Sequence, residues 1–489
     1  MSAFPFGVPA ALFVFGYLLF MLLVGYVARR KQRGESLDEF YLAGKNLGTF
    51  VLLLTLYATQ YSGNTLLGYP GEAFRLGFAW VMSVGFMMAI VVVYLIFAPR
   101  LYRLSRRHGF VTPGDWMTHR FGSPLLTQGV NLVLIVAMLN FLLAQLIAMG
   151  HVVAGLSGNR VPFWLGVVGL ALVIMTYETL GGMRAVAWTD CVQGVILLCG
   201  LVGLLLAAFP TPGHLQSVTQ WLIAHQPEKA AVPTAAVCRT WVSTLLLVGF
   251  SGAVYPQAIQ RIYAARSTRA LKRSLSVMVF MPLFSTLVVF LIGVVAIPHF
   301  SALRGVAADQ VMPMMLRQWA SQSSLLYMLA VLVITGVLAA IMSTADSVLL
   351  SLSSMLAKDV LSHTWLRHAS ERRITRAGKM VSWVVMAGLV GLAVAPKITL
   401  WGLTELKMEI LSQAAPSIIL GTVWPGLSTA GALGGLAAGL CLSVGLTLSG
   451  HAKVLGFHAG LLGLGLNFFL CAIVSSLLKA KRPPTRAGN

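Results

Sequence analysis

A polar segment at Ser343–Ser347 interrupts a stretch of sequence that is otherwise apolar enough to cross a bilayer. Ser343, Asp346 and Ser347 are spaced i, i+3 and i+4, so a helix would place their side chains on one face, with Thr344 beside them. Hydroxyl and carboxylate oxygens are the hard ligands that suit a dehydrated cation. The segment therefore predicts a cation site. The alternative is that the hydroxyls bond back to their own helix while Asp346 pairs with an arginine.

A second polar segment, Gly181–Asp190, lies between two long apolar runs. We expect Asp190 to begin a membrane span on its cytoplasmic side, at a depth compatible with the Ser343–Ser347 cluster. An N-terminal helix cap is its more common role, because the first amides of a helix carry partial positive charge. Cation coordination is compatible with that role. A central charge costs at least ~2.5–3.5 kcal/mol in a bilayer, so such segments indicate a function that involves ions.

The composition is typical of a polytopic membrane protein. The chain has 489 residues, of which 57% are hydrophobic and 10% are charged, and many apolar runs approach the roughly 20 residues that span a bilayer. We expect an all-α protein, residues 1–489, with a single transmembrane domain of about 13 helices. The expected spans are 5–27, 48–69, 77–99, 125–155, 162–180, 188–209, 237–257, 274–298, 323–357, 379–396, 399–424, 430–449 and 458–478.

The net charge of +21 follows the expected membrane topology. Most Lys and Arg residues, Arg261 among them, fall in alternate connections between the spans. By the positive-inside rule that side is cytoplasmic, which places the N-terminus outside and the tail 479–489 inside. No nucleic-acid partner is expected, and no obligate protein partner is evident. The first span follows no basic n-region, so we expect a retained helix rather than a signal peptide.

Several kinds of site are not expected. The five cysteines show no paired spacing and predict neither a disulfide framework nor a metal motif. No nucleophile with a base, no HExxH motif and no phosphate loop is present, so we expect no enzyme activity. The expected ligands are a small solute, a cation and membrane lipid, without an organic cofactor.

Two spans contain residues that weaken helix continuity. Ser62-Gly63-Asn64 lies in the middle of the second span, and Gly249, Ser251, Gly252 and Pro256 lie in or just after the seventh. Broken helices at matching positions of two halves indicate the binding site of a secondary transporter. The halves would be 48–209 and 237–424, inverted because each has five spans, with 5–27 before them and 430–478 after. The alternative is that the glycines only permit close helix packing.

We expect the two breaks to supply the solute contacts. The candidate residues are Gln60, Ser62, Asn64, Tyr255 and Gln257. Exposed amides at the N-terminus of a half-helix attract anionic groups, which favours an amino acid or a small organic acid over a neutral sugar.

Three charged residues in the eleventh span are a further candidate. Glu405 and Glu409 are spaced i, i+4 and share a face, with Lys407 pointing elsewhere. The two glutamates are possible solute or gate residues. The more common interpretation of such a trio is an internal ion-pair set or snorkelling to the surface.

Five sequence segments together resemble the sodium:solute symporter family, which includes proline, pantothenate, sialic acid and sugar carriers. The segments are FYLAGKNLG, YPGEAFRLG, GGMRAVAWTD followed by Gln193, QRIYAARS, and STADS followed by LLSLSSMLAKDV. The similarity runs from about residue 38 to residue 440. It implies a LeuT-like, inverted five-plus-five helix repeat with one helix before it and two after it.

The resemblance also implies cation sites. A sodium ion would lie where the broken second helix meets the ninth, held by the carbonyls of Ala58, Tyr61 and Ala340 and the hydroxyls of Ser343 and Thr344. Some family members bind a second sodium ion closer to the cytoplasm. The matching positions here are Asp190, Ser343, Asp346 and Ser347.

The chain departs from proline-type members at the expected solute site. It has Gln60 where they have an aspartate, and Val248 and Gly252 where they have aromatic residues. We therefore do not expect a proline carrier. We expect a sodium-coupled symporter of a bacterial inner membrane that imports a small polar organic solute, an amino acid or small carboxylate, by alternating access. The alternatives are proton coupling through Asp346 and Asp190, or a transporter-like solute sensor.

Overall fold

The computed structural model describes residues 6–32, 34, 36–157, 160–209, 211–394 and 399–478, and nearly all of them are helical. Ten helices in these ranges are long and apolar enough to cross a membrane. The all-α membrane architecture is therefore confirmed. The expected tail 479–489 and the last two residues of the expected span 379–396 lie outside the described residues.

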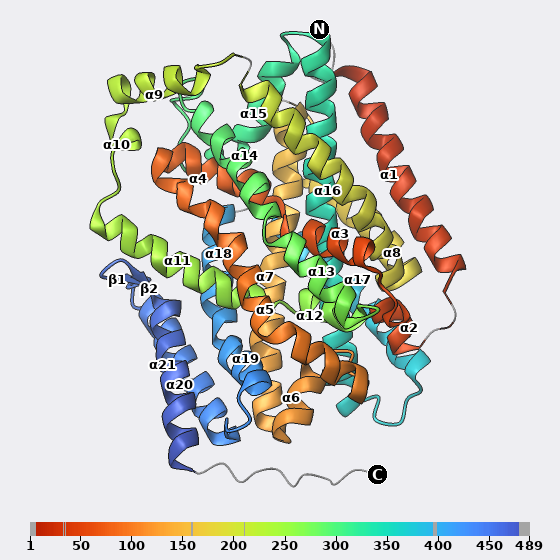
Figure 1. Cartoon of the computed structure of the whole chain (residues 1–489). Helices are drawn as coiled ribbons and strands as arrows, with labels where there is room; N and C mark the ends of the chain where they lie inside the picture. The colour runs from red at the N-terminus through yellow and green to blue at the C-terminus, as the bar shows by residue number, and fades with distance from the viewer. Residues whose placement is uncertain are drawn as a thin grey trace.

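The first half of the chain contains the first broken helix, between α3 and α4 (Figure 1). Its elements are α2 (Leu37–Leu42), η1 (Ala43–Lys45), α3 (Thr49–Gln60), η2 (Asn64–Gly68), α4 (Tyr69–Leu76), η3 (Gly77–Met82), α5 (Ser83–His108), α6 (Pro113–Phe121), α7 (Pro124–Ser157) and α8 (Phe163–Ala208). The short helices α9 (His214–His225) and α10 (Pro227–Ala230) connect it to the second half.

The second half contains the second broken helix. Its elements are α11 (Ala235–Ala253), α12 (Pro256–Ala264), α13 (Thr268–Met278), α14 (Met281–Val295), η4 (Gly305–Gln310), α15 (Val311–Ala320), α16 (Ser324–Ser354), η5 (Met355–Val360), η6 (Leu361–His363), α17 (Glu371–Ala393), α18 (Leu400–Leu411), η7 (Ser412–Ala414) and α19 (Ala415–Val423). Helix α16 packs along α8 and α7, in the middle of the bundle.

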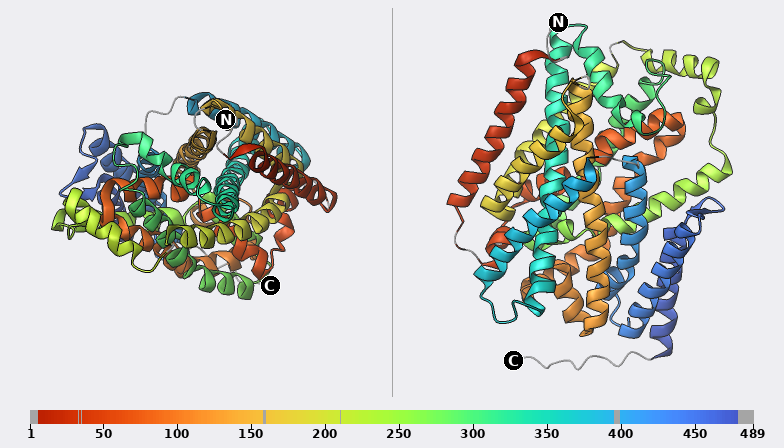
Figure 2. Two further views of the ribbon diagram at one scale, coloured as in Figure 1. Left: turned by 90° about the horizontal axis from the view of Figure 1, so that it is seen from above. Right: turned by 180° about the vertical axis from the view of Figure 1, so that it is seen from behind.

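The remaining helices lie at the edges of the bundle. Helix α1 (Gly7–Arg30) packs on α8, while α20 (Thr429–Leu448) and α21 (Ala459–Leu477) pack on each other at the opposite side (Figure 2). A short antiparallel ribbon of β1 (Lys453–Val454) and β2 (Phe457–His458) joins α20 to α21.

Both expected helix breaks are present. Helix α3 ends at Gln60, and Tyr61 has an extended backbone with ψ of 107°. The freed amide of Gly63 donates to Gln145 Oε1 on α7 at 2.8 Å. A Cβ added at Gly63 would lie 2.4 Å from the Cβ of Ala148, so only glycine fits this close approach. In the second half, α11 ends at Ala253 and α12 begins at Pro256.

The sharp bend in α8 corrects one expectation. Gly182 adopts φ of +52° and ψ of −147° inside this helix, a conformation that glycine tolerates and other residues rarely adopt. The segment after the bend is already helical well before Asp190. Asp190 is therefore not an N-terminal cap, because the first amides of this segment lie two turns earlier.

Candidate functional site

The break in α3 faces the polar segment of α16. The hydroxyl Oγ1 of Thr344 lies 3.3 Å from the carbonyl oxygen of Thr59 and 3.4 Å from that of Tyr61. Ala58 and Ala340, whose carbonyls the family resemblance also implies, are buried on the same two helices. The carbonyl oxygens at the helix break and the Thr344 hydroxyl thus converge where α3 meets α16. Oxygen ligands of this kind suit a small hard cation. Thr59 was not among the residues expected from sequence.

Beside this crossing, Asp190 and Arg261 form a fully buried ion pair. The guanidinium Nη2 of Arg261 lies 2.9 Å from Asp190 Oδ2. Arg261 Nε donates to Thr55 Oγ1 at 2.8 Å, and its Nη1 donates to the Gln257 carbonyl at 3.0 Å. The hydroxyls of Thr55 and Ser343 also donate to the Asp190 carboxylate. The pair is therefore satisfied on both sides, as a buried ion pair must be.

Asp346 belongs to the same network without an arginine of its own. It accepts hydrogen bonds from Tyr177 Oη at 2.6 Å and from Ser347 Oγ at 3.0 Å. Ser347 in turn accepts from the Arg261 guanidinium. The alternative expected from sequence is wrong in both parts. The arginine pairs with Asp190 rather than with Asp346, and the hydroxyls of Ser343 and Ser347 donate to carboxylates rather than to the backbone of their own helix.

The expected position of Arg261 was also wrong. It was counted with the basic residues of a cytoplasmic connection, but it is fully buried on α12. Its guanidinium lies between Asp190 and Ser347, two of the residues expected to hold a second cation. The available signal was its i, i+4 spacing from Gln257, which places both residues on one face of a helix.

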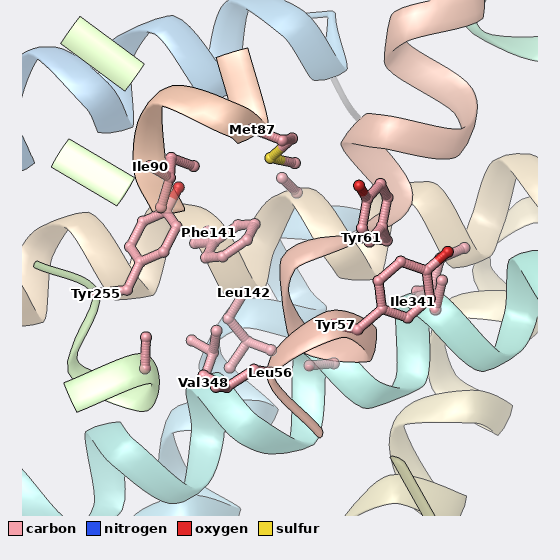
Figure 3. Packing of buried hydrophobic residues seen from close by; sticks show 14 of the residues in the cluster. Leu56, Tyr57, Tyr61, Met87, Ile90, Phe141, Leu142, Tyr255, Ile341 and Val348 are labelled. Atoms are coloured by element: carbon pink, nitrogen blue, oxygen red, sulfur yellow. The ribbon is translucent and has the colours of Figure 1, made fainter. Parts of the chain in front are cut away.

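A small cavity lined by buried residues lies between the two breaks. It has about 20 Å³ of space for a water-sized sphere, enough for about one water molecule. Figure 3 shows Tyr255 beside Phe141, with Met87 and Ile90 nearby. The lining residues are Gln60, Ser62, Asn64, Thr65, Tyr69, Met87, Ile90, Phe141, Val248, Tyr255, Thr404, Lys407 and Met408.

Polar atoms at the first break remain available to a solute. Gln60 Nε2 donates to Tyr94 Oη at 3.1 Å, and this hydroxyl donates to the Gly252 carbonyl at 3.0 Å, which links the two broken helices. The Oε1 of Gln60 and both amide atoms of Asn64 are buried without a hydrogen-bond partner in the described chain. Buried polar groups are normally paired, so such atoms indicate where a ligand binds.

The structure separates the remaining candidate residues. Of the five expected solute contacts, four line the cavity, and Gln257 does not. Glu405 lies 3.2 Å from both Lys453 and His458, and Glu409 accepts from Thr447 at 2.9 Å. The two glutamates therefore face α20 and the β-ribbon rather than the cavity. Lys407, whose role was left open, lines the cavity instead.

An aromatic cluster covers one side of the cavity. The ring of Tyr69, which lines the cavity, lies 5.8 Å from Trp80 and 5.6 Å from Trp401, and these two indoles are 4.6 Å apart. Nearby, Arg75 pairs with Asp309 at 3.0 Å, and Asp309 accepts from the amide of Leu400 at 2.9 Å. These contacts join α4 to α18 and close the cavity from that side.

Comparison with known proteins places the fold and the site in context. A family model described as the sodium:solute symporter family matches residues 40–439. The sodium/pantothenate symporter of Escherichia coli (strain K12) is 27% identical over 449 residues, covering 88% of this chain and 89% of that protein. The osmoregulated proline transporter OpuE of Bacillus subtilis (strain 168) is 26% identical over 469 residues, covering 95% and 94%.

Solved structures show the same architecture. A Na⁺-coupled sialic acid symporter in a substrate-bound outward-open state matches with a TM-score of 0.79 at 19% identity, covering 98% of this chain and 100% of that chain. MhsT in complex with L-phenylalanine matches with a TM-score of 0.52 at 12% identity, covering 88% and 98%. The chain belongs to the sodium:solute symporter family, and it is a membrane transporter rather than an enzyme.

Proposed function

We propose that this protein imports a small carboxylate-bearing solute together with sodium, by alternating access. The observation that carries the proposal is the crossing of α3 and α16, where two freed carbonyls face the Thr344 hydroxyl next to a small cavity. Inward movement of one sodium ion contributes about 2.3 kcal/mol per 100 mV of membrane potential, in addition to its concentration gradient. That energy drives accumulation of the solute.

The proposed sodium site uses Ala58, Tyr61, Ala340, Ser343 and Thr344. An ion held by both α3 and α16 would fix their relative position and stabilise one state of the transport cycle. Reciprocal linkage then requires that sodium and solute each raise the affinity for the other. The Ser343 hydroxyl donates to Asp190 in this structure, so its rotation toward the ion would couple sodium binding to the Asp190–Arg261 pair.

We further propose that the Arg261 guanidinium takes the place of a second sodium ion in this structure. It contacts Asp190 and Ser347 directly and reaches Asp346 through the Ser347 hydroxyl. A cation tethered to the protein balances one carboxylate but carries no charge across the membrane. Coupling of one sodium ion per solute is therefore the expected stoichiometry.

The carboxylate in the proposed solute is supported by two observations. The half-helix α12 begins at Pro256, next to the cavity-lining Tyr255, and the N-terminus of a helix favours anionic groups. The relatives named above carry pantothenate and proline, and both compounds contain a carboxylate. The membrane topology that we propose has about 13 helices, with the N-terminus outside and the C-terminus in the cytoplasm, as the positive-inside rule indicates.

The test is solute uptake into proteoliposomes that contain the purified full-length protein. An imposed inward sodium gradient should drive uptake, and removal of that gradient should abolish it. Thr344→Ala should weaken sodium activation by about tenfold, since it removes one ligand of a desolvated ion. Thr335→Ala is the matched control on α16, because among the described residues this hydroxyl bonds to the Val331 carbonyl of its own helix. Uptake that ignores sodium for every solute tested would overturn the proposal.

Proton coupling is the second candidate, and the position of Asp346 favours it. This carboxylate is fully buried and is contacted by the hydroxyls of Tyr177 and Ser347 rather than by a basic side chain. If Asp346 carries the transported proton, a pH gradient alone drives uptake and Asp346→Asn abolishes it. If sodium is the coupling ion, the Asp346→Asn variant retains sodium-driven uptake.

A further inference from the structure

Lys407 is a buried lysine without an acidic partner in the described part of the chain. Only 2% of its surface is exposed, and it forms neither an ion pair nor a hydrogen bond with any described residue. Its ammonium nitrogen lies 3.4 Å from the centre of the Phe141 ring and 5.0 Å from that of Tyr255. These two rings stack on each other at 5.3 Å and 22°. Aromatic faces shield the charge, but they accept no conventional hydrogen bond.

When the amine is protonated, the rings therefore balance only part of the cost of its buried charge. An ammonium group carries three donors, and a buried charge normally requires a partner of opposite charge and hydrogen bonds. The neighbouring glutamates on α18 do not provide one, because Glu405 pairs with Lys453 and His458 and Glu409 accepts from Thr447. An anionic partner can reach Lys407 from the cavity that this residue lines.

The rest of the cavity lining is uncharged. Its polar residues include Gln60, Ser62 and Asn64, and the unpartnered amide atoms of Gln60 and Asn64 are suited to hydroxyl, amide or carbonyl groups. No aspartate or glutamate lines the cavity, so no carboxylate is available to pair with a solute ammonium group. The cavity is thus complementary to a molecule with one anionic group and neutral polar groups.

We propose that Lys407 binds the carboxylate of the transported solute and that this solute is a net anion, rather than a zwitterionic amino acid or a neutral sugar. The inference rests on the proposed function and deepens it by naming the solute class. Phe141 and Tyr255 act as positioning residues, because their stacked faces direct the ammonium group toward the cavity. The neutral polar groups of the solute would meet Gln60 and Asn64 at the first break.

The test is thermal unfolding of the purified full-length protein with matched pairs of probes. Pantothenate, lactate and pyruvate are each compared with the corresponding alcohol or amide, and proline is included as a zwitterion. In sodium chloride, at least one of the carboxylates should raise the Tm in a saturable manner, and its uncharged analogue and proline should not. The inference is overturned if analogue and carboxylate stabilise equally, if proline stabilises more strongly, or if no carboxylate shifts the Tm.

Replacement of Lys407 separates this inference from the proposed function. Lys407→Met keeps a similar side-chain length without the charge, so it should retain the shift caused by sodium alone while carboxylate affinity falls at least about tenfold. Lys407→Arg should recover part of that affinity, which distinguishes charge from packing. Lys272→Met, at an exposed position on α13, should leave both shifts unchanged.

Two further outcomes have distinct meanings. If sodium compared with choline causes no shift in the wild-type protein while the carboxylate effect persists, sodium coupling fails but the role of Lys407 stands. If Lys407→Met binds the carboxylate as tightly as the wild type, or if chloride alone stabilises the protein as much as the carboxylate does, the role of Lys407 is overturned.

Discussion

Arg261 and Lys407 are both buried basic residues of this transporter, but the protein surrounds them differently. Arg261 bonds to a carboxylate, two hydroxyls and a backbone carbonyl. Lys407 has two aromatic rings beside it and no acidic partner among the described residues. The protein itself supplies the partners of Arg261, whereas in our proposal a molecule that enters the cavity supplies the partner of Lys407.

The chemistry of the two side chains fits this difference. The planar guanidinium group of arginine holds several acceptors in fixed directions, which suits a permanent crossing of helices, while the ammonium group of lysine is a compact charge with rotatable donors. Arg261 accordingly contacts residues of α3, α8 and α16 at once. Lys407 lies on α18 and lines the cavity between the two helix breaks.

The largest effect is expected from removal of Arg261, whose charge is paired with Asp190. Arg261→Met leaves the Asp190 carboxylate buried without its partner, which should lower the free energy of unfolding by about 3–5 kcal/mol. Thermal unfolding in detergent measures this loss. Arg269→Met, at an exposed position on α13, provides the control. Addition of Asp190→Asn to the Arg261 variant should restore part of the stability, and an Arg261→Met variant as stable as the wild type would show that the pair has no structural role.

An intermediate effect is expected from the ring nearest to Lys407. Phe141→Leu removes a cation–π contact that is worth up to about 2 kcal/mol when desolvated, in addition to the cost of lost packing. A double-mutant cycle with Lys407→Met isolates the contact, because packing losses occur in both backgrounds. Additive effects of the two substitutions would mean that the ring does not hold the ammonium group.

The smallest effect on stability is expected from removal of Lys407, which has no acidic partner among the described residues. Lys407→Met breaks no ion pair and relieves the burial of a charge, so the free energy of unfolding should stay within about 1 kcal/mol of the wild type or increase. The measurement is the same unfolding experiment without any solute. A loss as large as that of Arg261→Met would show that Lys407 has a structural counter-ion and would remove the contrast between the two residues.

Several features of the fold could be predicted from local sequence. The interruptions at Gly63 and Pro256 were expected because glycine and proline weaken a helix wherever it packs. The shared face of Ser343, Asp346 and Ser347 follows from helix periodicity alone. The family resemblance added the LeuT-like fold, which the solved structures support. The inverted arrangement of two five-helix halves stays a prediction.

The errors arose where a side chain is paired across the bundle. Asp190 was expected to cap a helix, because the sequence did not show that the bend at Gly182 starts the helix earlier. Arg261 was assigned to a cytoplasmic connection, since hydropathy does not distinguish a solvated arginine from one that contacts a buried carboxylate. Lys407 was expected to point away from its glutamate neighbours, as it does, but its destination was unknown.

The amino-acid sequence by itself determined the membrane-spanning helices, the positions of their breaks and the polar face of α16, because each depends on residues within a few turns of one helix. Only the tertiary structure decided that Arg261 meets Asp190 and that Lys407 meets an uncharged cavity. Those partners lie far apart along the chain. Helix packing decides whether a buried basic residue finds a partner within the protein or lines a cavity where a solute can bind. Local spacing in the sequence does not specify that packing.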